Sequence, residues 1–246
     1  MGNPIPGQVL LDQFKVEAFI DSGGMGAVFR VRDLKRNVPL ALKTLHSELA
    51  EDASIFKRFR REALALSKLS HPHIVRTYGL YQAEDFVFLL QDFIDGLPLS
   101  KLLEQKTNRR LSIQETMTVM KALCSALGFA HANGIIHCDI KPANVMLDRT
   151  GHVFLTDFGI ARHADSTTTT LAHAGAPAYM SPEQIKGKSV NAATDIYSLG
   201  ILLYEVLAGR KPFSGEEQST GKGTATRAER LRFAHLKLTP PDPRHF

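Results

Sequence analysis

The segment from Ile136 to Leu147 places three polar side chains with complementary chemistry within six residues. Asp139 can accept a proton from a hydroxyl group, Lys141 can steady a phosphoryl group in transfer, and Asn144 can offer an oxygen atom to a metal ion. Strand-forming apolar residues flank these side chains. Their types and spacing predict a site for chemistry on a phosphorylated substrate.

A second carboxylate follows this segment at the end of another short apolar run. Asp157 comes directly after Phe154-Leu-Thr and before Phe158-Gly159. Mg²⁺ prefers oxygen ligands and retains places for phosphate and water, so Asp157 and Asn144 together with phosphates would suit it. A surface turn explains either piece alone, but it does not explain both pieces at this spacing.

A glycine-rich turn near the amino terminus is a candidate phosphate-binding loop. The turn between two strand-like segments is Ile20-Asp-Ser-Gly23-Gly24-Met-Gly26-Ala-Val28. Glycines at such a turn let backbone N–H groups approach phosphate oxygens closely. A dinucleotide-binding loop is disfavoured because a helix, rather than a strand, should follow it. In isolation, most turns of this composition are only turns.

A lysine and a glutamate form the third candidate group. Lys43 ends the strand-like Ala41-Leu-Lys43, where a solvated lysine is the simpler interpretation if it is taken alone. Glu62 lies on the apolar stripe of a helix expected over 53–69, and a carboxylate there is costly unless it is paired. Lys43 is the candidate partner, and the pair could hold the α- and β-phosphates of a nucleotide.

The composition is that of an ordinary globular chain without a membrane segment. Of 246 residues, 43% are hydrophobic and 22% are charged, which excludes disordered and fibrous classes. The net charge of +5 comes from scattered basic residues, so we expect no nucleic-acid partner. Cys124 and Cys138 suit neither a disulfide framework nor a zinc site, and no apolar run is long enough to span a membrane. We therefore expect a cytoplasmic location.

The elements that position these groups change character along the chain. Short strands rich in β-branched and aromatic residues are expected at Phe14–Ile20, Ala27–Arg32, Val38–Lys43, 74–81 and 86–93. Later, Ser112-Ile-Gln-Glu115 is a capping box, followed at helical spacing by Met117, Met120, Cys124 and Leu127. The run Ala193–Ala208 is apolar on every side, which predicts a buried central helix closed by Gly209.

In this order, the motifs resemble those of the protein kinase family from about Phe14 to Pro243. Besides the glycine-rich turn they are Ala41-x-Lys43, Glu62, His137-x-Asp139-x-Lys141-x-x-Asn144, Asp157-Phe-Gly159, Ser181-Pro-Glu183 and Asp195-Ile-Tyr-Ser-Leu-Gly200. The turn and the segment 175–184 most resemble the bacterial, eukaryotic-like serine/threonine kinases. The resemblance implies an α+β fold of two lobes: an antiparallel five-stranded sheet with one helix at 14–93, a hinge at 94–98, and a mainly helical lobe at 99–246 that lacks the family's last helices.

The resemblance also implies ATP and Mg²⁺ as cofactors and proteins with serine or threonine acceptors as substrates. Asp139 would be the catalytic base, Lys141 would assist transfer, and Asp195 would brace the catalytic loop. Glu183 would anchor the activation segment. Lys43, oriented by Glu62, would bind phosphates, and Asn144 and Asp157 would bind Mg²⁺. The loop over the nucleotide would comprise Ile20, Gly23, Gly24 and Gly26. Adenine would contact Val28, Ala41 and Met146 and form backbone hydrogen bonds with Asp92 and Ile94, with Gln91 as the gatekeeper.

Several positions depart from the family pattern. Asp21 replaces the first glycine of the turn, Ala176 replaces a threonine, and Cys138 replaces the arginine that pairs with a phosphorylated activation segment. Without that arginine, we hypothesise that activity depends only weakly on phosphate there, even if Thr168 or Thr170 is autophosphorylated. The departures leave an alternative open, in which the chain is a pseudokinase that acts as a nucleotide-binding or scaffolding module.

Overall fold

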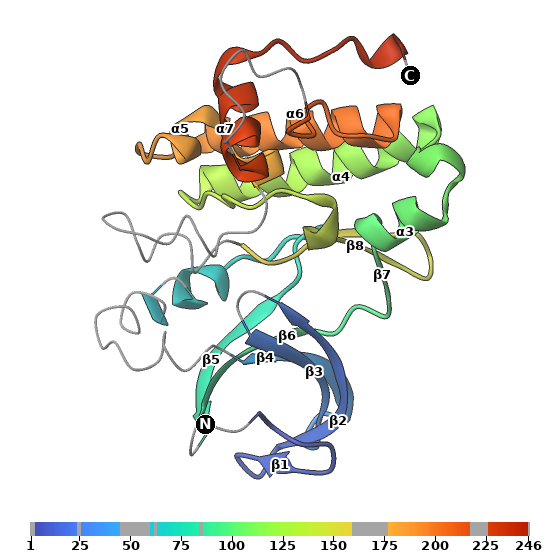
Figure 1. Ribbon diagram of the computed structural model, residues 1–246. Coiled ribbons are helices and arrows are strands. Elements are labelled where there is room, and N and C mark those ends of the chain that lie inside the picture. Colours follow the sequence, from blue (N-terminus) through green and yellow to red (C-terminus); the bar gives the residue numbers. More distant parts are fainter. Residues whose placement is uncertain are drawn as a thin grey trace. The chain divides into compact units, whose positions relative to one another are not determined.

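The computed structural model describes residues 3–23, 26–44, 60–61, 63–83, 86–158, 177–216 and 226–245. Contacts between these residues divide the chain into two compact units, with the boundary between Asp95 and Gly96. The first unit is mainly sheet and the second mainly helix (Figure 1). The α+β class expected from the sequence is therefore confirmed.

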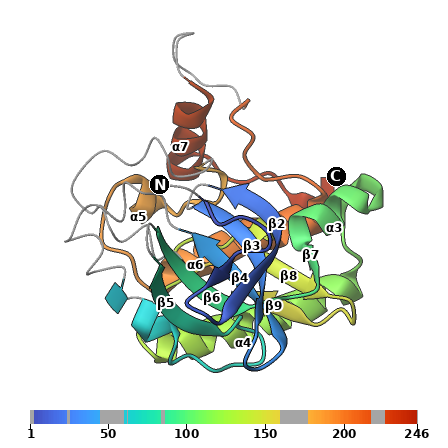
Figure 2. The same cartoon turned by 90° about the horizontal axis from the view of Figure 1, so that it is seen from below.

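An antiparallel sheet with the strand order β1-β2-β3-β4-β6-β5 forms the body of the first unit. Its strands are β1 (Val9–Leu10), β2 (Phe14–Gly23), β3 (Gly26–Asp33), β4 (Val38–Thr44), β5 (Thr77–Ala83) and β6 (Phe86–Asp92). Figure 2 shows β2, β3 and β4 as neighbouring arrows of this sheet. The strands β2 to β6 are the five that the sequence predicts, and β1 is a further two-residue strand that pairs with the start of β2.

One face of this sheet carries the apolar core of the first unit. On β3, the buried side chains of Ala27, Phe29 and Val31 alternate with half-buried ones. The same alternation on β4 buries Leu40 and Leu42. Because successive side chains of a strand point to opposite faces, the residues between these core positions lie together on the other face.

The second unit is arranged around two long helices, α4 (Ile113–Ala132) and α6 (Ala192–Ala208), which pack against each other. The predicted capping box starts α4, with both of its hydrogen bonds formed between Ser112 and Glu115. Gly209 ends α6 in the left-handed conformation, with φ of 74°. A Cβ atom at Gly209 would lie 2.1 Å from the main-chain oxygen of Asn108, so only glycine fits there.

A small antiparallel sheet with the order β7-β8-β9 precedes α6 in the chain and packs against α4. Its strands are β7 (Gly96–Pro98), β8 (Val145–Asp148) and β9 (Val153–Leu155). The remaining elements of the unit are α3 (Leu99–Gln105), α5 (Pro182–Ile185), α7 (Arg227–Lys237) and the 3-10 turns η1 (Thr107–Arg109), η2 (Pro142–Asn144), η4 (Pro177–Tyr179) and η5 (Pro243–His245).

The two long helices lie where the sequence predicts them, but one expectation about burial was wrong in part. On α4, Met117 and Cys124 are exposed, and the buried face includes Val119 and Leu123. The helix α6 is buried over most of its surface, but Ile196 is 57% exposed. The apolar spacing located both helices, whereas the elements that pack against them decide which side chains are covered.

Of the helix expected over 53–69, residues 60–61 and 63–66 are helical and residues 67–69 are not. The other residues of that range, 53–59 and 62, lie outside the described part of the chain. Across the described part of the chain, no helix is both long and apolar enough to cross a membrane.

Candidate active site

Three polar side chains meet in the segment that runs from the end of α4 to the end of η2. The Lys141 ammonium group donates a hydrogen bond to the Oδ2 atom of Asp139 at 2.9 Å. The amide nitrogen of Asn144 donates to the same oxygen at 3.0 Å and to the main-chain oxygen of Asp139 at 2.7 Å. The structure thus brings together Asp139, Lys141 and Asn144, as their spacing in the sequence predicts.

Asp157 is held next to this group because β8 and β9 pair. The main-chain oxygen of Asn144 accepts hydrogen bonds from the N–H of Thr156 at 2.9 Å and from its hydroxyl at 3.2 Å. Asp157 follows directly and has φ of 57°, a left-handed conformation that is uncommon for a residue other than glycine. Asn144 and Asp157 therefore lie at the same end of the β8–β9 hairpin.

His137 is fully buried and supports the loop from beneath. Its Nδ1 atom accepts from the N–H of Asp139 at 3.2 Å, so its Nε2 atom carries the proton that is donated to the main-chain oxygen of Thr156 at 2.8 Å. Burial lowers the pKa of His137, which favours this neutral ring. The ring of Phe158 lies 4.5 Å away, centroid to centroid. His137 is a packed structural residue.

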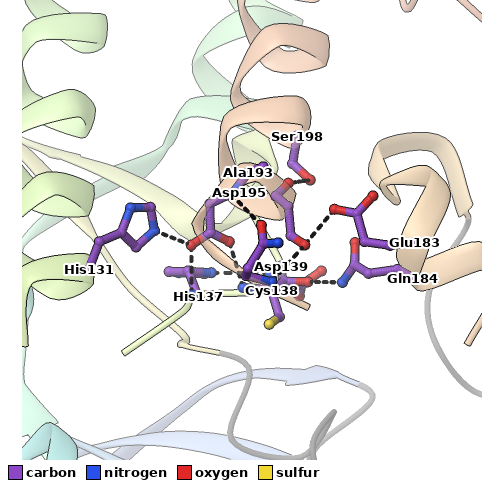
Figure 3. Close-up of polar contacts among 11 residues, drawn as sticks. His131, His137, Cys138, Asp139, Glu183, Gln184, Ala193, Asp195 and Ser198 are labelled. Carbon is purple, nitrogen blue, oxygen red and sulfur yellow. Dashed lines mark hydrogen bonds and ion pairs between the residues drawn. The ribbon is translucent and has the colours of Figure 1, made fainter. Parts of the chain in front are cut away.

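Asp195, in the first turn of α6, is the buried acceptor that braces the loop (Figure 3). Its Oδ2 atom accepts from the N–H of His137 at 2.8 Å and lies 2.7 Å from the Nε2 atom of His131. Its Oδ1 atom accepts from the N–H of Cys138 at 2.8 Å. The Asp195 side chain is 0% exposed, so these bonds satisfy a carboxylate that has no access to water. The bracing role that the resemblance implied is confirmed.

The one-turn helix α5 contacts the same loop through Gln184. The Nε2 atom of Gln184 donates to the main-chain oxygen of Cys138 at 2.8 Å. Next to it, the Oε1 atom of Glu183 accepts from the Thr194 hydroxyl at 2.6 Å. Burial opposes ionisation of Glu183, but the bonds from Thr194 and from the helix start outweigh it and lower the pKa of Glu183. Glu183 thus ties α5 to the first turn of α6.

In the first unit, the candidate nucleotide-binding residues share one face of the sheet. Val28 on β3 pairs with Lys43 on β4, and Ala41 lies two residues before Lys43 on the same side of that strand. Gln91 on β6 pairs with Ala41 and joins this face. The amide nitrogen of Gln91 donates to the Thr77 hydroxyl at 3.0 Å, which fixes the orientation of its side chain.

Gly26 is explained by a close approach within the sheet. Its φ is 144°, and a Cβ atom would lie 1.9 Å from the main-chain oxygen of Thr44. The Thr44 hydroxyl also accepts from the N–H of Ala27 at 2.9 Å and donates to its oxygen at 3.2 Å. From the sequence, Gly26 is a candidate for phosphate binding, but the packing of β3 on β4 already requires glycine at this position.

The remaining predicted residues belong to several different elements. Ile20 on β2 is 46% exposed, and Asp21 beside it is exposed with its carboxylate accepting from the N–H of Ser22. Asp92 ends β6, where its carboxylate accepts from the Tyr78 hydroxyl at 2.8 Å. Gly23 ends β2, Ile94 follows β6, and Met146 lies on β8 of the second unit. Predicted residues outside the described part of the chain are Gly24, Glu62, Gly159, Thr168, Thr170 and Ala176.

A family model described as the protein kinase domain matches residues 14–245. The chain belongs to the protein kinase family. Enzymes of this family use ATP as the phosphoryl donor. The match extends over both compact units and includes every motif on which the resemblance rests.

Two bacterial proteins illustrate the curated relatives of this kinase chain. It is 38% identical over 246 residues to serine/threonine-protein kinase PknB of Mycobacterium tuberculosis (strain ATCC 25618 / H37Rv), covering 96% of this chain and 37% of the relative. It is 37% identical over 212 residues to serine/threonine-protein kinase PrkC of Bacillus subtilis (strain 168), covering 85% of this chain and 32% of the relative. The chain therefore spans about a third of the length of these relatives and is of their bacterial type.

Solved structures give the same kinase fold. The kinase domain of Mycobacterium tuberculosis PknI superposes with a TM-score of 0.73 at 25% identity, covering 97% of this chain and 92% of that one. A double mutant of the same domain gives a TM-score of 0.72 at 27% identity, with 86% and 81% covered.

Three residues of this kinase site were not predicted from the sequence. His131, Thr156 and Gln184 each make a hydrogen bond to the catalytic loop or to its supports. Ser181-Pro-Glu-Gln184 is a capping-box pattern, so the sequence could have located the turn of Gln184. No comparable local pattern indicates His131 or Thr156, because their partners are brought to them by the tertiary fold.

Proposed function

We propose that this domain transfers the γ-phosphoryl group of ATP to serine or threonine hydroxyls of proteins. The observation that carries the proposal is the hydrogen-bonded group of Asp139, Lys141 and Asn144, beside which the β8–β9 hairpin holds Asp157. The printed names of the relatives, serine/threonine-protein kinases, support the acceptor class. An oriented carboxylate, a cation and two oxygen ligands are what transfer of a phosphoryl group to a hydroxyl requires.

Asp139 and Lys141 have distinct roles in the proposed reaction. The Asp139 carboxylate accepts the proton of the substrate hydroxyl while the hydroxyl oxygen forms a bond to the γ-phosphorus atom and the bond to the β,γ-bridging oxygen breaks, releasing ADP. Lys141, which donates to one carboxylate oxygen of Asp139, holds this side chain in place and adds a positive charge near the transferring group.

The donor set in the second unit fits Mg²⁺. The main-chain oxygen of Asp139 can only accept, so the amide nitrogen of Asn144 faces it and the Oδ1 atom of Asn144 points away. That oxygen and the Asp157 carboxylate would hold the ion, which prefers few protein oxygens and leaves places for phosphate and water. When bound, Mg²⁺ would neutralise charge on the phosphates.

Most of the proposed nucleotide contacts belong to the first unit. Val28 and Ala41, on the face opposite the core, are proposed to pack on adenine together with Met146, and the main chain of Asp92 and Ile94 to bind its polar edge. Lys43, on the same face, is proposed to bind phosphates with Glu62 as its partner. The turn with Ile20, Gly23, Gly24 and Gly26 is proposed to cover the phosphates.

We also propose the limits and setting of the domain. The kinase domain extends over 14–246, with lobes at 14–93 and 99–246 joined by a hinge at 94–98. Its partners are protein substrates, and Thr168 or Thr170 is a candidate for autophosphorylation. Neither Cys124 nor Cys138 forms a disulfide bond, which is compatible with a cytoplasmic location.

The test is phosphate transfer to a basic acceptor protein, followed by intact-mass measurement and identification of the modified residues. We expect wild-type protein with Mg·ATP to modify serine or threonine, and the same protein with EDTA to modify neither. We expect Asp139→Asn, which cannot accept the proton, to transfer far less phosphate than wild type. Its matched control is Asp12→Asn, which changes an exposed carboxylate with φ of 52°, a conformation that asparagine tolerates, and should transfer phosphate as wild type does. Nucleotide binding without any transfer would instead support the pseudokinase alternative.

A further inference from the structure

Gln184, at the end of α5, uses both ends of its side-chain amide. Its Oε1 atom accepts from the N–H of Ser181 at 3.0 Å and completes the capping box of α5. Its Nε2 atom donates to the main-chain oxygen of Cys138 at 2.8 Å. Figure 3 shows this side chain directed from α5 toward the catalytic loop. One amide therefore links the start of α5 to a loop 46 positions earlier in the chain.

The peptide group that accepts this bond is the one directly before Asp139. Its N–H, which belongs to Asp139, donates to the Nδ1 atom of His137 at 3.2 Å. Both polar atoms of this peptide group are therefore bonded, and its plane is fixed. The plane fixes the Asp139 N–Cα bond, from which the side chain starts, so it limits the directions that the carboxylate can take.

Cys138 has a backbone conformation that needs support. Its φ of 63° lies in the left-handed region, which is unfavourable for a residue with a Cβ atom. Its N–H is held by Asp195 at 2.8 Å and its carbonyl oxygen by Gln184. The strained backbone is thus held from two helices, by Asp195 of α6 on one side and by Gln184 of α5 on the other.

We propose that Gln184 is a positioning residue for phosphoryl transfer, which aims the Asp139 carboxylate through the carbonyl group of Cys138. The inference rests on the proposed function and adds a residue to it. Because the same amide caps α5, the geometry of the catalytic loop depends on the folding of the segment Ser181–Ile185. The contact joins a neutral amide and a carbonyl, so this coupling requires neither a phosphate nor a charged side chain.

Gln184→Glu separates the bond to Cys138 from the helix cap. A glutamate retains an acceptor for the N–H of Ser181, but its other oxygen faces the Cys138 carbonyl and can donate only when it is protonated. At pH 8 we expect kcat to fall about tenfold while KM for ATP changes less than about twofold. As the pH is lowered to 6, the ratio of variant to wild-type kcat should rise by about threefold or more, because the carbonyl favours the protonated acid.

Two further variants serve as controls for this pH profile. Gln114→Glu introduces the same change at an exposed position in the first turn of α4, and its kcat ratio should stay within about twofold of one at every pH. Gln184→Leu removes both the donor and the acceptor, so its kcat should be lowered by about tenfold or more with a ratio that does not change with pH.

Hydrogen exchange tests the inference without relying on activity. In the absence of ATP, the peptide that covers residues 137–145 should exchange about fivefold faster in Gln184→Leu than in wild type, while peptides from the middle of α4 should not change. If wild type transfers no phosphate, the proposed function fails and hydrogen exchange still decides this inference. Wild-type kcat in Gln184→Glu at pH 8, a loss that does not lessen at pH 6, or unchanged exchange in Gln184→Leu would overturn it.

Discussion

The sheet of the first unit and the catalytic loop of the second position functional side chains by different means. Val28, Ala41 and Lys43 share a face because strand register puts them there, and an apolar core on the opposite face holds the strands. The loop with Asp139 is not held by paired strands in this way. It is held by side chains that bond its main chain, chiefly Asp195 from α6 and Gln184 from α5.

This difference has a consequence for substitutions. A sheet face distributes its support over many backbone bonds and apolar contacts, so one changed side chain alters it only locally. The loop depends on a few buried polar groups, and removal of one leaves several donors without partners. Substitutions in the loop supports should therefore affect both stability and transfer, whereas changes to side chains on the sheet face opposite the core should act mainly on nucleotide affinity.

The largest effect is expected for Asp195→Ala. The change leaves the N–H groups of His137 and Cys138 and the ring of His131 without their buried acceptor. We expect the free energy of unfolding in urea to fall by about 3–5 kcal/mol and phosphate transfer to be lost.

The neighbouring position supplies the control for that prediction. Ile196→Ala changes an exposed side chain of the same helix and should alter the unfolding free energy by less than about 0.5 kcal/mol. If the unfolding free energy of Asp195→Ala lies within about 1 kcal/mol of the wild-type value, the loop has other supports and the contrast with the sheet is removed.

The next effect concerns a glycine of the sheet. Gly26→Ala would force a Cβ atom against the main-chain oxygen of Thr44. We expect the free energy of unfolding in urea to fall by about 3 kcal/mol and ATP binding to weaken. Gly79→Ala is the matched control, because Gly79 has φ of 134° but a Cβ atom there would meet no other atom within 4 Å. It should cost only the backbone strain, about 1 kcal/mol. Equal losses in both variants would mean that the contact with Thr44 is not the reason for glycine at position 26.

A smaller effect is expected from pH, through His137. Burial lowers its pKa in the folded protein below the ordinary value near 6.5, so the unfolded chain binds more protons in mildly acidic solution. Its contribution to stability is complete above pH 6.5 and is lost as the pH falls below it. We expect a loss of up to about 2 kcal/mol between pH 6.5 and 5, measured as unfolding free energy in urea.

The comparison protein for this profile is His137→Gln, which cannot titrate. Its stability should fall less steeply over the same range, and the difference in slope belongs to His137. The pKa of His71 is also lowered by burial, but that residue is present in both proteins and cancels. Carboxylates with a lowered pKa, such as Glu183, lose their contribution only below about pH 4.5. Parallel profiles for the two proteins would contradict the neutral buried state of His137.

The smallest effect is expected from Thr168 and Thr170. If side chains of α5 and α6 hold the catalytic loop and Cys138 offers no cation, phosphate at these threonines adds little. The double change Thr168→Ala and Thr170→Ala should lower the rate of transfer to an acceptor protein by less than about threefold. A residual rate below about a tenth of wild type would refute this hypothesis.

Much of the fold was predictable where the signal is local. The β-branched and aromatic residues of β3 and β4, the capping box at Ser112 and the glycine after α6 each indicated an element that the structure contains. The two-residue strand β1 was missed because a run of that length has no readable period.

The candidate site was predictable in its residues but not in its supports. Asp139, Lys141 and Asn144 lie close together in the chain, so their meeting follows from sequence. The bond from Gln184 to Cys138 joins distant segments, and the left-handed backbone of Cys138 depends on that bond and on Asp195. Neither is encoded in a short pattern, because both result from the packing of α5 and α6 around the loop.

The most direct test of the proposed site measures nucleotide binding and phosphate transfer on the same Asp139→Asn protein. The amide retains the size of the carboxylate but cannot accept the proton of a substrate hydroxyl at neutral pH. We predict a Kd for Mg·ATP within about threefold of wild type by calorimetry, and a transfer rate at least about 100-fold lower by intact mass. Transfer at the wild-type rate would contradict the assignment of Asp139 and with it the proposed site.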